Sequence, residues 1–120
     1  MSVRAIRGAI QVEANSAEAI SSGTKELLLE IMSANGLTPE DVISVILTAT
    51  PDLTAVFPAA AAREVGFSAV PLMCAVEIDV DGAMPRVVRA MATVSTELQP
   101  SQINHIYLAG AKALRTDIAQ

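Results

Sequence analysis

The sequence has almost no aromatic side chains: tryptophan is absent, and Phe57, Phe67 and Tyr107 are the only rings of this kind in 120 residues. The core must therefore be built from aliphatic side chains, and rows of rings that stack on nucleobases are not available. Positive charge is also scarce, because eight Lys and Arg face thirteen Asp and Glu, which gives a formal net charge of −5. No Lys/Arg cluster interrupts this acidic balance, so the sequence argues against a nucleic-acid partner.

Residues that bind metals or form covalent intermediates are equally rare. Cys74 and His105 are the single cysteine and the single histidine, so an internal disulfide is excluded and a metal site is not expected. A nucleophilic Cys74–His105 pair stays a minor alternative, because nothing in the spacing brings the two together and a lone cysteine more often serves as a small buried hydrophobe. A glycine-rich loop with phosphate-binding spacing is missing too.

Long apolar runs are also missing. No segment approaches the roughly 20 apolar residues that cross a bilayer, and Arg7 interrupts the stretch that a signal peptide would need, so we expect a cytoplasmic protein without membrane contact. The chain length and the lack of linkers or repeats predict one domain, residues 1–120. The mean hydropathy of +0.46 is high for so short a chain. Either apolar surface buried between subunits or the abundance of alanine explains it.

What the chain does contain is a regular order of strand and helix patterns. β-Branched residues predict a strand over 2–13, and the helix after it has Asn15 as its N-cap and Asn35-Gly36 at its end. Further expected elements are a short helical turn at 38–41, a helix at 58–66, and strands at 42–50, 70–80, 86–98 and 104–109. This order predicts an α+β fold, a mixed β-sheet with helices packed on one side.

Three charged residues, Arg7, Glu77 and Arg89, are embedded in otherwise apolar predicted strands. A buried charge is costly unless it is paired, so each needs a partner or a polar pocket. Arginine is suited to two-pronged recognition of carboxylates and phosphates, which favours a site for a small anion. A structural ion-pair network explains the same residues equally well. Acid/base catalysis by Glu77 and Asp79 is a further option, although Asp79 falls at a predicted turn and is expected to be solvated.

Five segments in order along the chain resemble one known family: "RAIRGA" at 4–9, "TATPDLTAVFPAAAARE" at 48–64, "VPLMCAVEIDV" at 70–80, "RVVRAM" at 86–91 and "INHIYLAGAKALR" at 103–115. Together they resemble the trimeric α/β class of chorismate mutase. The resemblance implies a homotrimer that forms a pseudo-barrel, with active sites between subunits. It also implies an isomerase that converts chorismate to prephenate, a step of phenylalanine and tyrosine biosynthesis, by an intramolecular Claisen rearrangement without cofactor or nucleophile.

The resemblance also implies roles for individual residues. Glu77 accepts a hydrogen bond from the ring hydroxyl of the substrate, and Cys74 lies beside it. Arg89 contacts the ether oxygen, and Arg7 and Tyr107 bind the enolpyruvyl carboxylate. Strict alternation along 70–80 nevertheless puts Cys74 and Glu77 on opposite strand faces. Either a bulge lies between them or Cys74 contributes through its backbone.

The remaining implied contacts come from an adjoining subunit and from the end of the chain. The resemblance assigns the adjoining wall to Phe57, Ala59 and Arg63, and a tail that helps to cover the site to Arg115. Two positions depart from the pattern, because Ala60 stands where relatives can carry Lys and Met73 where they can carry Thr. One peripheral charge and one polar contact are therefore expected to be absent. The alternative function is a non-catalytic trimeric module that binds a small anionic metabolite.

Overall fold

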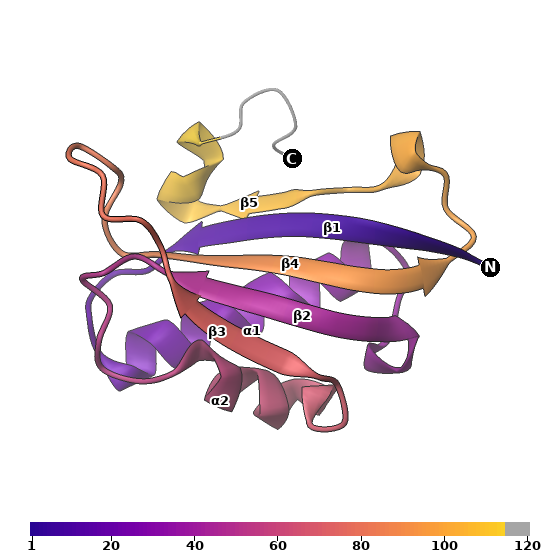
Figure 1. Ribbon diagram of the computed structural model, residues 1–120, viewed down its shortest axis with the longest axis horizontal. Helices are drawn as coiled ribbons and strands as arrows, with labels where there is room; N and C mark the ends of the chain where they lie inside the picture. The colour runs from indigo at the N-terminus through magenta and orange to yellow at the C-terminus, as the bar shows by residue number, and fades with distance from the viewer. Residues whose placement is uncertain (115–120) are drawn as a thin grey trace.

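The structure is a computed structural model that describes residues 1–114. Its five strands form one sheet in the order β3-β2-β4-β1-β5 (Figure 1). The three central strands pair antiparallel, and each edge strand runs parallel to its neighbour. The strands are β1 (Ser2–Gln11), β2 (Val42–Ala49), β3 (Leu72–Val76), β4 (Val87–Thr96) and β5 (Ile106–Leu108). The expected mixed sheet of an α+β fold is confirmed.

Two helices, α1 (Ala17–Ala34) and α2 (Pro58–Ala62), lie on the same face of this sheet, behind it in the view of Figure 1. The inner stripe of α1 is buried and mostly aliphatic, and it packs with β1 in the main core. Gly8 in the middle of β1 allows this close approach, because a Cβ there would lie 2.9 Å from side-chain atoms of both Leu27 and Ile31. None of the helices in residues 1–114 is both long and apolar enough to cross a membrane.

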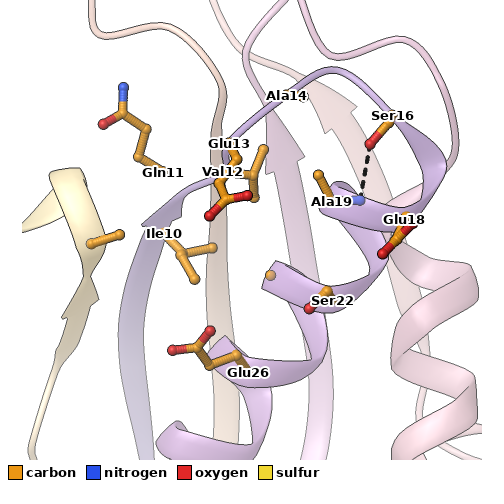
Figure 2. Close-up of a pocket in the computed structure, with 12 residues that line it drawn as sticks. Ile10, Gln11, Val12, Glu13, Ala14, Ser16, Glu18, Ala19, Ser22 and Glu26 are labelled. Carbon is orange, nitrogen blue, oxygen red and sulfur yellow. Dashed lines mark hydrogen bonds between the residues drawn. The ribbon is translucent and has the colours of Figure 1, made fainter.

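The start of α1 differs from the prediction. Ser16 is the N-cap, and its Oγ accepts a hydrogen bond of 3.1 Å from the Ala19 N–H (Figure 2). Asn15, the predicted cap, instead accepts hydrogen bonds from the N–H groups of Thr54 and Ala55 at 2.9 and 3.1 Å. Asn and Ser are both good N-caps. Asn15 does not cap α1 because it binds the distant residues Thr54 and Ala55, a contact that the local sequence does not reveal.

The predicted strand at 70–80 is shorter than expected. β3 ends at Val76, the last residue that pairs with β2, and the Glu77 N–H donates to the Ala49 carbonyl at 2.9 Å. The chain then leaves the sheet as a projecting loop before β4 (Figure 1). Ile78 and Val80, whose apolar character extended the predicted strand, are exposed. The strand ends because β2 offers no further partner residues.

The predicted helix at 58–66 also ends early. α2 stops at Ala62 and continues as a wider, kinked turn over Arg63–Phe67. Gly66 adopts a φ of 103°, which glycine tolerates best. Helical 3₁₀ turns cover Pro39–Asp41, Pro100–Gln102 and Ala109–Ala113, and the first of these confirms the helical turn expected at 38–41.

The face of the sheet opposite the helices, here called the open face, carries Arg7 of β1 and Arg89 of β4. Register places Met73, Ile46, Met91 and Arg7 in one row across the sheet. The next row contains, in strand order, Ala75, Thr48, Arg89, Ala9 and Tyr107. Residues far apart in sequence therefore meet on one surface because of strand pairing.

Candidate active site

Arg7, Arg89 and Tyr107 come together on the open face. Ala9 is paired with Arg89 on one side and Tyr107 on the other, and Arg7 lies two residues earlier on the same face of β1. The three side chains line a hollow of about 260 Å³, and the remaining lining residues include Ile46, Thr48 and Met91. Two guanidinium groups and a phenol suit a ligand that carries carboxylates.

Glu77 reaches this group from the end of β3. Both of its carboxylate oxygens accept from Arg89 Nε, at 3.2 and 3.0 Å, and Oε2 also accepts from the Thr48 hydroxyl at 2.6 Å. The Glu77 side chain is 16% exposed and that of Arg89 is 41% exposed. These hydrogen bonds offset the desolvation cost of burying the Glu77 carboxylate. The pairing with Glu77 uses one of the five N–H donors that a guanidinium carries, so the rest of the Arg89 head remains available to a ligand.

Arg7 stands outside this ion pair. Within residues 1–114, no carboxylate lies within 4 Å of its guanidinium. Its backbone N–H donates to His105 Nδ1 at 3.0 Å. A purely structural network would require Arg7, Glu77 and Arg89 to satisfy one another, and they do not. The Arg7 charge faces a hollow in place of a protein partner, which favours an anion site.

Cys74 lies on the opposite face of the sheet. It packs against the main core and lines a second hollow of about 580 Å³ together with Phe57, whose side chain is largely exposed. The β2–β3 register is unbroken from Val45–Leu72 to Ala49–Val76, so no bulge precedes Glu77. Alternation therefore holds, and the Cys74 side chain points away from the Glu77–Arg89 pair.

The structure also separates Cys74 from His105. Cys74 is in β3, at one edge of the sheet, and His105 immediately precedes β5, at the other edge. The nucleophilic pair left open by the sequence is wrong, because the full width of the sheet lies between the two side chains. Asp79, the other carboxylate considered for acid/base chemistry, is exposed on the projecting loop.

The residues expected from an adjoining subunit lie away from the arginine-lined hollow of their own chain. Ala59 is buried in α2, Ala60 beside it is half-buried, and Arg63 is exposed just after the helix. All three belong to the helical face. Met73 is on the open face, opposite Ile46, and is exposed. Arg115 lies outside the described residues.

A third hollow, of about 460 Å³, lies between the end of β1 and the first turns of α1 (Figure 2). Its lining includes the carboxylates of Glu13, Glu18 and Glu26 and no basic residue. An anionic ligand would be repelled there. Among residues 1–114, no group of three or more His, Cys, Asp or Glu side chains is arranged to hold a metal ion. The arginine-lined hollow is thus the better candidate for an anion.

Two residues of the site were not identified from the sequence. Thr48 donates to Glu77, and His105 accepts from Arg7. A threonine in an apolar strand and a lone histidine carry no local signal for such contacts. Only the register of β2 with β4, and of β1 with β5, could have indicated them.

Comparison with known proteins agrees with this geometry. Residues 3–118 match the family model of chorismate mutase type I. The chain is 47% identical over 117 residues to the chorismate mutase AroH of Thermus thermophilus, covering 97% of this chain and 96% of that protein. It is 46% identical over 120 residues to the chorismate mutase AroH of Bacillus subtilis, covering 99% and 94% respectively.

A solved structure gives the same result. A chorismate mutase from Clostridium thermocellum superimposes with a TM-score of 0.90 at 46% sequence identity, and the match covers 92% of this chain and 98% of that one. Fold, length and sequence agree over nearly the whole molecule, and the conclusion is that this chain belongs to the chorismate mutase type I family.

Proposed function

We propose that this protein converts chorismate to prephenate at the arginine-lined hollow of the open face, with Arg7, Glu77 and Arg89 as its catalytic residues. The observation that carries the proposal is the meeting of Arg7, Arg89 and Tyr107 around one hollow in a chain of this family. Chorismate carries two carboxylates, a ring hydroxyl and an ether link. The hollow offers cationic and phenolic donors to the acidic groups, and Glu77 offers an acceptor for the hydroxyl.

Arg89 supplies the main electrostatic effect in this proposal. In the rearrangement the ether C–O bond breaks as a new C–C bond forms within the same molecule, so no proton, oxidant or second reactant is required. Negative charge grows on the ether oxygen, and a fixed guanidinium directed at it stabilises the transition state more than the ground state. The two hydrogen bonds from Nε to Glu77 hold the guanidinium in place.

Arg7 and Tyr107 bind the enolpyruvyl carboxylate and so hold the flexible substrate in a compact conformation. Rigid orientation of the two reacting parts lowers the entropic part of the barrier. Both residues are mounted on paired strands, which favours such rigidity. Because no bulge precedes Glu77 and the Cys74 side chain points to the helical face, Cys74 contributes through its backbone and forms no covalent bond with the substrate.

The proposed assembly is a homotrimer in which an adjoining subunit completes each site. Large apolar side chains exposed on the open face support it, because a monomer rarely leaves such a patch in water; they include Val3, Ile46, Met73 and Met91. Phe57 and Arg63 are exposed and do not line the hollow of their own chain, so they are available to line that of a neighbour, whereas Ala59 is buried in α2.

The direct test is to add purified protein to chorismate and follow both chorismate absorbance and prephenate formation. The proposal expects stoichiometric conversion, without added metal or cofactor. The alternative, a module that binds a small anion without turning it over, predicts binding in calorimetry with no loss of chorismate. That second outcome would contradict the catalytic proposal.

A further inference from the structure

Arg7 and Tyr107 lie on different strands, so their relative position depends on how β5 pairs with β1. This pairing is only three residues long, from Gly8–Ile106 to Ile10–Leu108. β5 is also an edge strand, and among residues 1–114 no strand pairs with its side away from β1 (Figure 1). A one-residue slip would turn every side chain of β5 to the other face of the sheet. Something besides three backbone pairs is needed to fix Tyr107 beside Arg7.

His105 forms a hydrogen bond to β1 directly beside this short strand pairing. Its Nδ1 accepts from the Arg7 backbone N–H at 3.0 Å. Arg7 is the residue just before the first β1–β5 pair, and His105 is the residue just before Ile106. The imidazole therefore extends the strand contact by one position, and it does so at the residue whose guanidinium faces the hollow.

A second contact holds the same segment on another element. Asn35, at the C-terminal end of α1, donates from Nδ2 to the Asn104 carbonyl at 3.0 Å and accepts from the Asn104 N–H at 2.8 Å. Asn35 is buried, so this contact is shielded from water. It ties residue 104 to the helix and does not touch β1. The link from this segment to Arg7 is made by His105.

We propose that His105 is a positioning residue for substrate binding, which sets the placement of Arg7 relative to Tyr107 through the hydrogen bond to the Arg7 N–H. The bond requires a lone pair on Nδ1, so the ring must carry no proton on that nitrogen. This inference rests on the proposed function, because it assumes that Arg7 and Tyr107 together bind the enolpyruvyl carboxylate.

Two substitutions test the inference by steady-state kinetics with chorismate. His105→Leu removes the acceptor and keeps an apolar side chain of similar bulk, whereas His105→Asn places an amide oxygen near the position of Nδ1. Loss of one hydrogen bond that orients a binding residue is expected to raise KM about tenfold for His105→Leu, with kcat within about threefold of wild type. His105→Asn should restore KM to within about threefold of wild type.

Thr24→Val is the matched control. Thr24 is buried in α1 and its hydroxyl donates to the Ile20 carbonyl at 2.7 Å, so the variant loses one buried hydrogen bond without touching β5 or Arg7. Its KM should stay at the wild-type value. An equal rise in KM for Thr24→Val and His105→Leu would overturn the inference, because general loosening would then explain both. So would a wild-type KM in His105→Leu, or an His105→Asn variant as impaired as His105→Leu.

Nuclear magnetic resonance on the wild-type protein tests the bond without any variant. Scalar coupling between the Arg7 amide and Nδ1 of His105 is expected at neutral pH, and a proton found on Nδ1 would overturn the inference even if the leucine variant failed to fold. The same experiment separates two failures. If wild-type protein leaves chorismate unchanged, the proposed function is wrong, while the coupling still reports whether His105 holds Arg7.

Discussion

The pairing of Arg89 with Glu77 explains why two charges are tolerated within an apolar sheet. Each offsets part of the desolvation cost of the other, and the Thr48 hydroxyl satisfies one more carboxylate lone pair. The same contacts fix the direction of the guanidinium. A structural ion pair and a catalytic arrangement are therefore not alternatives here, because the pair is what would hold the cation ready for a ligand.

Substitution of Arg89 is expected to reduce kcat strongly. Removal of one preorganised donor at the site of developing charge costs about 3 to 4 kcal/mol, which is a loss of roughly a hundred- to a thousandfold. Arg89→Lys should not restore the rate, because an ammonium cannot reproduce the planar fork of donors. The measurement is kcat and KM of folded Arg89→Ala and Arg89→Lys.

Arg4→Lys is the control for that experiment. Arg4 is on the same sheet, and its Nε donates to the Leu98 carbonyl at 3.1 Å, away from the hollow. Its turnover should match wild type. If either Arg89 variant kept kcat within about threefold of wild type, the stabilising charge would have to come from another residue.

Cys74 and Glu77 should respond differently to substitution. Cys74→Ala is expected to retain most of the turnover, because the thiol points to the helical face and the rearrangement has no covalent step. Glu77→Gln keeps the shape of the side chain but removes the charge that pairs with Arg89, and should lose tenfold or more in kcat/KM, on the scale of a hydrogen bond to a charged group. Kinetics and intact-protein mass spectrometry check this; a substrate adduct on Cys74 would contradict it.

At the scale of elements, the close contact between α1 and the sheet depends on Gly8. A Cβ there would lie 2.9 Å from the Ile106 carbonyl oxygen as well as from side chains of α1. Gly8→Ala should therefore destabilise the fold by about 1 to 3 kcal/mol, as overpacking does. A lower midpoint of urea unfolding is the expected result, and an unchanged midpoint would show that β5 and α1 can both move aside.

The elements themselves could be predicted from the sequence, whereas some of their ends could not. Five strands and two helices follow from apolar periodicity. The apolar pattern predicts too late an end for β3, because Ile78 and Val80 continue it after pairing with β2 has ended. The local sequence predicts the N-cap of α1 one residue early, because Asn15 and Ser16 are equally good caps. In both cases a contact with a distant segment, and not the local sequence, determines where the element begins or ends.

The same distinction applies to the site. Arg7, Glu77 and Arg89 could be identified because a charge within an apolar strand is conspicuous. Thr48 and His105 could not, since their significance depends on which residues stand opposite them in neighbouring strands. Sequence patterns reveal residues whose type is unusual for their surroundings. They do not reveal residues such as Thr48 and His105, whose type is common and whose role arises only from their neighbours in the folded sheet.

At the scale of the whole molecule, light scattering at micromolar concentration should report about three times the 12.5 kDa mass of one chain. The physical reason is the set of large apolar side chains exposed on the open face, among them Ile46, Met73 and Met91, because a monomer rarely leaves such a patch in water. A stable monomer that converts chorismate would contradict both the trimer and the shared sites.

Mixing of inactive subunits tests whether neighbours share a site. Arg89→Ala and Arg63→Ala trimers are each expected to be impaired. When they are unfolded together in equal amounts and refolded, about a quarter of the sites in a random cyclic trimer combine Arg89 of one subunit with Arg63 of the next. Recovery of activity to that extent is the expected result. No recovery beyond the average of the two parents would place both arginines in the same subunit's site.

Tyr107 gives the molecule a built-in optical probe. It is the only tyrosine, the chain has no tryptophan, and its ring is buried at the wall of the arginine-lined hollow. Intrinsic fluorescence of the unlabelled protein therefore comes, apart from a weak contribution of two phenylalanines, from a single ring whose place in the fold is known. A change in its emission on adding an anion would report from one named point of the hollow, with no dye and no substitution.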